Sequence, residues 1–278
     1  MKNPIETVIF IGDEHAGCRL GLCPIRGVTL DSGSRYKPNK VQRKIWRHWN
    51  YIDKVWIPMV TKGQKYTLVN MGDAIDNKHH GSVTQFSHNR ADHIKVAYEL
   101  LAPWVEKADR FYMLRGTEAH SGKSGEFEEL LAEKLGAIPD EHGRYARDDL
   151  WMKIGPALGH FTHHVATVSS PYTESTGILK ELITAYTAAG KMGIRAPNLL
   201  GRAHRHACSE IRLPGKYGYD IAFATSGWQA KGPFVWRMVR GRNCPVDVGA
   251  SMAKWDEREK EIYTRHKVWY LERPRIEG

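Results

Sequence analysis

One pattern occurs five times in this chain: a short run of β-prone residues that ends in a group of Asp, Glu or His residues. In chain order the five segments are TVIFIGDEH, YTLVNMGDAID, RFYMLRGTEAH, ALGHFTHH and NLLGRAHRH. Runs of this length and composition predict strands. Helical stretches between them favour an α/β fold with a central sheet, and such sheets collect functional residues beyond the carboxyl ends of their strands. We therefore expect the acidic and histidine groups to meet at one sheet edge.

Apolar residues between these segments recur at helical spacing. From residue 40 to 60 an apolar side chain returns every three or four positions, which predicts a helix with one buried face. Its Trp residues share that spacing, so we expect core packing and not base stacking by Trp46, Trp49 and Trp56. Further helices are expected at 91–107, where Pro103 should kink or end the helix, at 124–135 and at 174–190.

The part of the chain from about residue 211 is expected to be rich in β-strands. YDIAFATSGW and KVWYLE are its strand candidates, and the charged stretch KWDEREKE between them predicts a turn or a short helix. No internal repeat and no convincing linker interrupts the 278 residues. We therefore expect a single domain over residues 1–278.

Charge and apolar content restrict the classes of partner. Lys and Arg number 41 against 31 Asp and Glu, and this net charge of +10 would attract DNA, RNA or another polyanion. There is no run of about 18 or more apolar residues and no secretion-signal pattern, so we expect a cytoplasmic protein without a membrane partner. The four cysteines form no CxxC pair and are interpreted as reduced thiols. No sequence feature indicates an oligomeric state.

Two pairs of polar residues have the spacing of metal ligands. Residues i and i+2 of a strand point to the same side, so Asp13 and His15 can reach one ion, as can His204 and His206. Carboxylates and imidazoles without thiolates suit Mn²⁺, Fe, Zn²⁺ or Ni²⁺ better than Ca²⁺. An Asp shared by two ions would complete the clamp used in phosphoryl hydrolysis, and Asp73 is the natural candidate.

Taken in order, these groups resemble the five motifs of the calcineurin-like metallophosphoesterase superfamily, which are D-x-H, G-D-x-x-D, G-N-H-[DE], H and G-H-x-H. Four of the five are present in order between Asp13 and His206. The segments RGTEAHSG, FTHHV and RAHRH look most like a phage or prophage-encoded branch of that superfamily. Ala203 stands where the family usually has Gly, which should cost little unless the backbone there needs a positive φ.

The resemblance implies an α/β fold of the four-layer αββα sandwich type, with two divalent metal ions held by loops at one edge of the two sheets. Mn²⁺ is the favoured metal, and Fe, Zn²⁺ and Ni²⁺ are alternatives. By the family pattern, the first metal would be held by Asp13, His15, Asp73 and His206, and the second by Asp73, His163 and His204.

The third motif departs from the family. The family has an Asn ligand followed directly by the His that assists the leaving group, whereas here Gly116 is followed by Thr117, Glu118, Ala119 and His120. Either Thr117 or Glu118 replaces the Asn as ligand and His120 keeps the catalytic role, or His120 is itself a ligand. We prefer the catalytic role, because a longer turn could still bring the imidazole over the metals.

Some nearby residues allow two interpretations. His163 and His164 end the same expected strand on opposite faces, and we favour His163 as the ligand. Asp76 could serve the site or only hold its loop through backbone hydrogen bonds. His79 and His80 could face the substrate, but a solvated loop is the expected position.

Three arginines lie in or beside the motifs and are candidates to neutralise a phosphate. Arg115 and Arg205 are the predicted substrate contacts, although Arg115 and Arg202 could equally be ordinary charges at strand ends. The leading hypothesis is a metal-dependent phosphoesterase with a dinuclear centre, whose favoured substrate is a nucleic acid or another phosphodiester. The alternatives are a phosphomonoesterase acting on a protein or a small molecule, and a non-catalytic module that binds nucleic acid or a partner.

Overall fold

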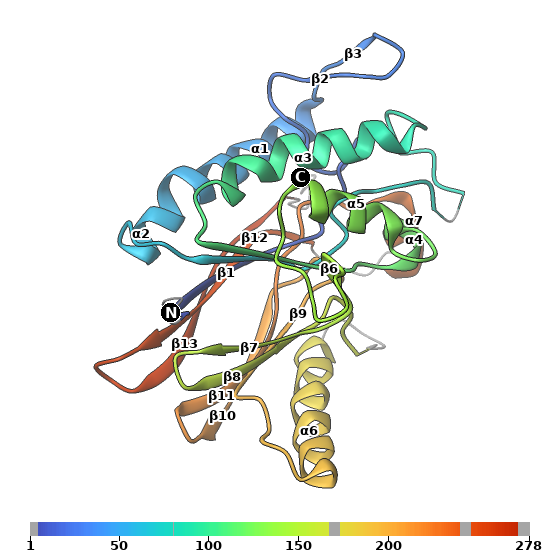
Figure 1. Cartoon of the computed structure of the whole chain (residues 1–278). Coiled ribbons are helices and arrows are strands. Elements are labelled where there is room, and N and C mark those ends of the chain that lie inside the picture. The colour runs from blue at the N-terminus through green and yellow to red at the C-terminus, as the bar shows by residue number, and fades with distance from the viewer. Residues whose placement is uncertain (1–4, 80, 167–172, 240–245, 272–278) are drawn as a thin grey trace, which may run out of the picture.

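The computed structural model describes residues 5–79, 81–166, 173–239 and 246–271 (Figure 1). Its larger sheet has six strands in the order β13-β12-β1-β4-β5-β6. Four consecutive strands, β1, β4, β5 and β6, run parallel, and β12 and β13 continue the sheet beyond β1 through antiparallel pairings. The bounds are β1 Thr7–Ile11, β4 Thr67–Asn70, β5 Arg110–Leu114, β6 Ala146–Arg147, β12 Asp247–Asp256 and β13 Glu261–Tyr270.

A second sheet has five strands in the order β10-β11-β9-β8-β7. Its three central strands, β11, β9 and β8, are parallel, with an antiparallel strand at each edge. A small hairpin of two further strands projects from the molecule (Figure 1). The bounds are β7 Leu150–Ile154, β8 Ala157–Phe161, β9 Leu199–Arg202, β10 Ser209–Gly215 and β11 Gly218–Ala224, with β2 Val28–Thr29 and β3 Arg35–Tyr36 in the hairpin.

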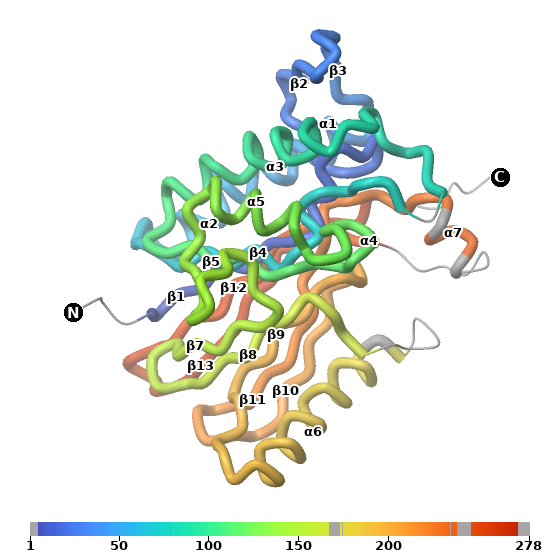
Figure 2. The backbone as a smooth tube through the Cα atoms, turned by 45° about the vertical axis from the view of Figure 1, so that its right-hand side comes forward, coloured from blue at the N-terminus to red at the C-terminus, as the bar shows by residue number. Residues whose placement is uncertain are grey.

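Helices cover the outer faces of both sheets, and the two inner faces pack on each other (Figures 1 and 2). The six-stranded sheet is covered by α1, α2, α3 and α5, and the five-stranded sheet by α6. This arrangement is the αββα sandwich that the resemblance of the motifs implies. The bounds are α1 Lys40–Tyr51, a π-helical turn Ile52–Trp56, α2 Ile57–Thr61, α3 Arg90–Val105, α4 Glu118–Ser121, α5 Glu126–Lys134, α6 Glu174–Met192 and α7 Pro233–Val239.

The strand β1 shows how the sequence produces these layers. Val8 and Phe10 point into the core between the sheets, where the ring of Phe10 lies 4.8 Å from that of Phe161. Ile9 and Ile11 point to the opposite side, into the core beneath the helices. Because both faces of the strand are covered, its sequence is continuously apolar instead of alternating.

The expected helices are present, with shifted ends. The helix predicted at 40–60 is interrupted by the π-helical turn, and α3 runs through Pro103 and ends two residues later, at Val105. Trp49 and Trp56 are buried and Trp46 packs against the same core, as expected from their spacing. Among the described residues, no helix combines the length and the apolar character needed to cross a membrane.

The β-rich C-terminal part does not form a unit of its own. Its strands are divided between the sheets, since β10 and β11 join the five-stranded sheet and β12 and β13 the six-stranded one. The charged stretch KWDEREKE forms the ends of β12 and β13 and the turn between them.

A polar contact links the two sheets near their edges. Glu210 of β10 accepts hydrogen bonds from His266 and Thr264 of β13, and the Nε2 atom of His266 lies 2.8 Å from the carboxylate. Nδ1 of His266 lies 2.8 Å from the hydroxyl oxygen of Ser251 in β12. Burial alone would raise the pKa of Glu210, but these hydrogen bonds outweigh it and lower the pKa to about 2.

Candidate metal centre

Four loops bring metal-ligand side chains together at one edge of the sandwich. They follow β1, β4, β8 and β9, all of which are parallel strands whose carboxyl ends lie on the same side. The loops contribute to two groups whose possible ligand atoms lie within 4.8 Å of one another, and the loop after β9 contributes to both. The first group is Asp13, His15 and His206, and the second is Asp73, His163 and His204.

The backbone of these loops differs from the extended geometry that the sequence suggests. Asp13, His15, Asp73, His204 and His206 all have positive φ, between 47° and 72°. The prediction that each i, i+2 pair shares one face of a strand is therefore wrong, because β1 ends at Ile11 and β9 at Arg202. Left-handed backbone at a non-glycine residue costs roughly 1–2 kcal/mol, so the surrounding contacts must hold it.

That difference in backbone changes what the two pairs do. Asp13 and His15 still meet in one group, but His204 and His206 face different groups. Ala203, which directly precedes His204, has no positive φ. Its Cβ therefore adds no backbone strain at the position where the motif usually has Gly.

In the first group, two ring nitrogens and a carboxylate oxygen converge on one point. Nε2 of His206 lies 3.1 Å from Nε2 of His15 and 3.1 Å from Oδ1 of Asp13. Nδ1 of His15 is engaged on the other side, 3.1 Å from Oδ1 of Asp76. Such a contact fixes the orientation of a metal-binding histidine and leaves its Nε2 for the ion.

The second group repeats this arrangement. Nδ1 of His163 donates to the carbonyl oxygen of Met71 at 2.7 Å, and its Nε2 lies 3.1 Å from Oδ2 of Asp73 and 3.3 Å from Nδ1 of His204. Asp73 is also close to His15 and His120, so its carboxylate lies between the two groups. Gly116 permits this position, because a Cβ at residue 116 would lie 2.0 Å from Oδ1 of Asp73.

The charges of the centre compensate one another. Burial disfavours ionised Asp13 and Asp73, but the neighbouring histidines outweigh this effect and hold the pKa of both carboxyl groups below the usual range. Burial would likewise lower the pKa of His163, yet the charge of Asp73 raises it to about 9. The ionised carboxylates and the neighbouring histidines therefore stabilise each other, and a cation bound at these atoms would release the histidine protons.

The donor set fits two divalent cations. Each group offers one carboxylate and two imidazoles that converge on a common point, without thiolates. The ring nitrogens of His15 and His163 that face away from the groups are already hydrogen-bonded to protein acceptors, as is usual for metal-bound histidines.

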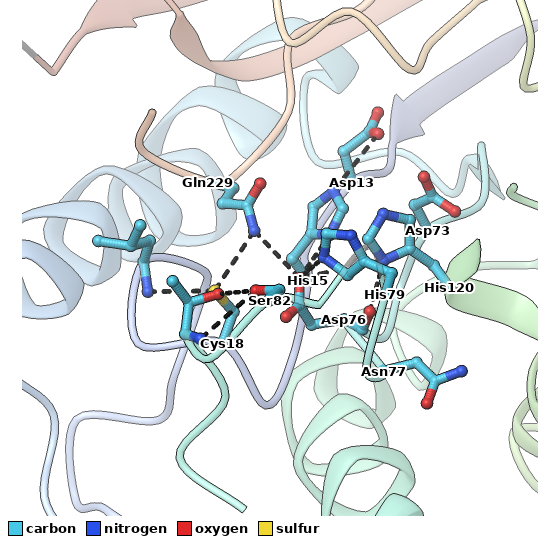
Figure 3. Close-up of polar contacts among 12 residues, drawn as sticks. Asp13, His15, Cys18, Asp73, Asp76, Asn77, His79, Ser82, His120 and Gln229 are labelled. Carbon is cyan, nitrogen blue, oxygen red and sulfur yellow. Dashed lines mark hydrogen bonds and ion pairs between the residues drawn. The ribbon is translucent and has the colours of Figure 1, made fainter. Parts of the chain in front are cut away.

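Asp76 supports the first group through side chains and not through the backbone contacts that one interpretation of the sequence suggests. Its carboxylate accepts hydrogen bonds from Nε2 of Gln85 at 2.6 Å and Nε2 of Gln229 at 3.1 Å, in addition to its contact with His15. Figure 3 shows His15, His79 and His120 grouped around it. We interpret Asp76 as a positioning residue for His15.

The departing third motif forms the one-turn helix α4 instead of an open turn. Its His120 donates from Nδ1 to the backbone oxygen of Asp76 at 2.5 Å, and its ring centroid lies 4.5 Å from that of His15. Burial lowers the pKa of His120 to about 4. The structure therefore brings His120 to the metal groups, in a place compatible with either role considered for it.

The two other candidates of this motif differ in position. The Thr117 backbone N–H donates to Oδ1 of Asp73 at 2.7 Å, and its hydroxyl group lies within 3.2 Å of both carboxylate oxygens. The side chain of Glu118 is exposed and belongs to neither metal group.

The neighbouring histidines differ in their exposure to solvent. His163 is buried inside the second group, whereas His164 is exposed. His79 is not in a solvated position: its side chain is 14% exposed and its ring centroid lies 4.3 Å from that of His120. His80 lies outside the described residues.

The three arginines also have different surroundings. Arg205 lines the cavity above the metal groups. Arg115 points instead toward Glu129 and Asp148, at 3.5 and 3.7 Å, and does not line that cavity. Arg202 is buried against Glu181, 3.1 Å from its carboxylate.

One functional residue, Glu128 of α5, escapes sequence reasoning. Its carboxylate accepts from the backbone N–H groups of Ala74 at 3.0 Å and Gly116 at 2.6 Å, and so ties together the loops that follow β4 and β5. Burial and the nearby charge of Asp73 raise the pKa of Glu128 to about 7. The only sequence signal was the acidic start of the expected helix at 124–135.

A cavity of about 680 Å³ opens above the two groups, a volume in the range of small-molecule sites. Its lining includes His15 and His206 of the first group and Asp73 and His204 of the second, but neither Asp13 nor His163. The polar side chains named above that line it are His15, Asp73, His79, His120, His204, Arg205, His206 and Gln229.

No protein-family model and no curated protein matches the chain. Among solved structures it is similar to a conserved uncharacterized protein from Streptococcus pneumoniae described as a predicted phosphoesterase, with 11% identity, 95% of this chain and 98% of that chain covered, and a TM-score of 0.37. A metallophosphoesterase from Sphaerobacter thermophilus has 10% identity, 94% and 88% coverage and a TM-score of 0.37. Vacuolar Protein Sorting 29 from Cryptosporidium parvum has 10% identity, 96% and 100% coverage and a TM-score of 0.37. At these values the likeness adds no argument about activity, which is argued from the site itself.

Proposed function

We propose that this protein is a metal-dependent phosphoesterase that hydrolyses phosphodiesters at a dinuclear centre. One observation carries the proposal: two carboxylate–imidazole groups meet at Asp73 beneath a cavity of about 680 Å³. Asp13, His15, Asp73 and His206 would hold one cation, and Asp73, His163 and His204 the other. Two bound cations, Mn²⁺ being favoured, would acidify a water molecule and neutralise charge on the phosphate.

The protein side chains would orient the substrate and handle the proton of the leaving group. Arg205 lines the cavity and would contact a phosphate oxygen. Nδ1 of His120 is occupied by the Asp76 carbonyl, so only Nε2 can exchange a proton with the leaving oxygen. An anionic substrate beside His120 would raise its pKa and favour the protonated form that the step requires.

Phosphodiesters, and nucleic acids among them, are favoured by the net charge of +10. The test is hydrolysis of bis-p-nitrophenyl phosphate, p-nitrophenyl phosphate, and single- and double-stranded DNA by the purified protein with Mn²⁺. We expect cleavage of the diester and little cleavage of the monoester. Preference for the monoester would indicate a phosphatase, and inactivity on all four substrates with Mn²⁺, Fe²⁺, Zn²⁺ and Ni²⁺ would contradict the proposal.

A further inference from the structure

The cavity above the metal groups has a second wall of a different chemical character. This wall is apolar, whereas the metal groups on the other side of the cavity are charged. It comes from the connection between β11 and β12, which contains α7. Figures 1 and 2 both show α7 beside α4, the helix that carries His120. We define the Trp236 wall as Pro233, Val235, Trp236 and Val246.

Trp236 is the largest apolar side chain on this wall, and 47% of it is exposed. On one side its ring is covered by Lys231, whose Nζ lies 4.4 Å from the ring centroid. Lys231 is buried and does not line the cavity, whereas Trp236 does. The indole is therefore supported from behind and presents its remaining surface to the cavity.

Such a surface suits a flat aromatic group. Tryptophan offers a large rigid area at a small cost in conformational entropy, and stacking on an aromatic ring binds nucleobases of any sequence. Exposed apolar side chains that gather at one site commonly mark a binding surface. Val83, which is 82% exposed, and Leu20 line the same cavity and extend its apolar area.

Positive charge accompanies this apolar surface. Arg205 and Arg237 line the cavity together with Trp236, and the chain as a whole carries a net charge of +10. A ligand that matches both features has an anionic phosphate joined to a planar ring. A phosphoserine peptide or a phosphorylated sugar supplies the anion without a planar aromatic ring, and a phosphotyrosine carries its ring on a monoester and not on a phosphodiester. A phospholipid supplies flexible acyl chains instead of a flat face.

We propose that the Trp236 wall is a base-stacking subsite, so that the phosphodiester placed over the metal groups belongs to a nucleotide. This inference rests on the proposed phosphoesterase function and specifies its substrate class. The metal groups would hold the phosphate, while the base of an adjoining nucleoside stacks on the indole of Trp236.

The first test compares two substrates that release the same p-nitrophenolate. Thymidine 5′-(p-nitrophenyl phosphate) carries a base, and methyl p-nitrophenyl phosphate does not. With Mn²⁺ we expect the native protein to prefer the thymidine ester in kcat/KM by roughly 5- to 100-fold, the usual effect of one stacked base. Trp236→Ala should remove most of this preference and leave the methyl ester unchanged, and Trp236→Phe should keep most of it.

Trp151 provides a matched control. It is 45% exposed, which is close to the value for Trp236, but it does not line the cavity. Trp151→Ala should therefore leave both substrates unaffected. A loss of the base preference in this variant, or its persistence in Trp236→Ala, would overturn the inference.

The second test measures binding without metal or turnover. In EDTA, the affinity for a fluorescent thymidine decamer is compared with that for an abasic decamer of equal charge. We expect tighter binding of the thymidine decamer by the native protein and equal affinities for Trp236→Ala. Arg237→Ala should weaken both ligands equally, because a phosphate contact does not read bases. Equal affinities in the native protein would overturn the base subsite and favour a phosphopeptide or lipid substrate.

The two tests keep the subsite and the enzymatic activity apart. Hydrolysis of both esters at equal rates, unaffected by Trp236→Ala, would refute the subsite while the phosphoesterase function stands. Base-dependent binding that vanishes in Trp236→Ala, without hydrolysis of either ester, would support the subsite and refute the function. A thymidine dinucleotide separates two kinds of ligand. If the natural ligand is a free nucleotide, the dinucleotide should bind as tightly as the decamer, and if it is a strand, the decamer should bind more tightly. The base preference must appear with both probes.

Discussion

Nδ1 of His15 and Oδ1 of Asp76 form a buried ion-pair contact at 3.1 Å. This contact connects the first metal group to a network of amide side chains. The carboxylate orients the ring, and Gln85 and Gln229 in turn hold the carboxylate. Asp76 thus influences the first group without belonging to it, and it forms a further possible ligand group with His79 and His120.

Asp76→Ala should therefore weaken binding of one metal ion by roughly 10- to 100-fold and leave the other site close to native affinity, because only the orientation of His15 is lost. Isothermal titration with Mn²⁺ measures both affinities. Asp148→Asn, a change at an exposed carboxylate that pairs with Arg115 and Arg144, is the control and should alter neither. Equal weakening of both sites would contradict the assignment of Asp76 to His15.

Asp73→Asn should reduce hydrolysis by orders of magnitude and weaken both metal sites, because a single carboxylate lies between the two groups. Elemental analysis of the purified variant and its activity on bis-p-nitrophenyl phosphate measure the two effects. Two full metal equivalents in an equally active variant would rule out the proposed centre.

His120→Ala distinguishes the two roles left open by the sequence. A leaving-group catalyst should lower kcat by roughly 10²- to 10⁴-fold on an alkyl diester, but less on a p-nitrophenyl ester, whose leaving group needs little protonation, and metal content should stay constant. A metal ligand should instead cost one metal equivalent and slow both substrates equally. His142→Ala, at an exposed histidine, is the control. Full metal content with unchanged rates on both substrates would reject both roles.

Glu210→Gln should make stability less dependent on acid pH. Because the folded-state pKa of Glu210 is lowered to about 2, its contribution is present above the ordinary Glu pKa of about 4.5 and is lost as the pH falls toward 2. At pH 7 the variant should lose about 1–3 kcal/mol of unfolding free energy, and the difference from the native protein should shrink between about pH 4.5 and 2. Urea unfolding across this range measures it, with Glu133→Gln, at an exposed position of α5, as a control. A difference that stays constant with pH would contradict the role of the carboxylate.

An α/β fold and the meeting of the metal-ligand residues at one sheet edge could be predicted from local patterns, whereas the four-layer αββα sandwich was implied only by the resemblance of the motifs to a known superfamily. Apolar β1 is covered on both faces, and parallel strands necessarily place their following loops at one edge. The left-handed backbone at Asp13 and His204 could not be predicted, since it depends on contacts with distant loops, such as the hydrogen bond from the His204 N–H to Asp13. The same holds for Glu128, whose two backbone partners come from other loops.

The direction in which a side chain points also could not be predicted from the sequence. Arg115 follows β5 and therefore looked like a phosphate ligand, but its guanidinium turns to Glu129 on α5. The position of Trp236 beside the cavity could not be predicted for a different reason. The helix α7 has only seven residues, too few to show a periodic apolar pattern, and its position over the site depends on where β11 and β12 end.

The position of α7 in the chain has a consequence for how a protein of this design could diversify. The segment from Ala224 to Asp247 leaves one sheet and enters the other, and the residues of α7 that line the cavity make no contribution to either metal group. Substitutions in α7 can therefore alter which molecules enter the cavity while the metal loops remain intact, whereas Gln229 of the same crossover holds Asp76 and is not free to vary. Substrate range could thus drift among homologues without a matching drift in chemistry.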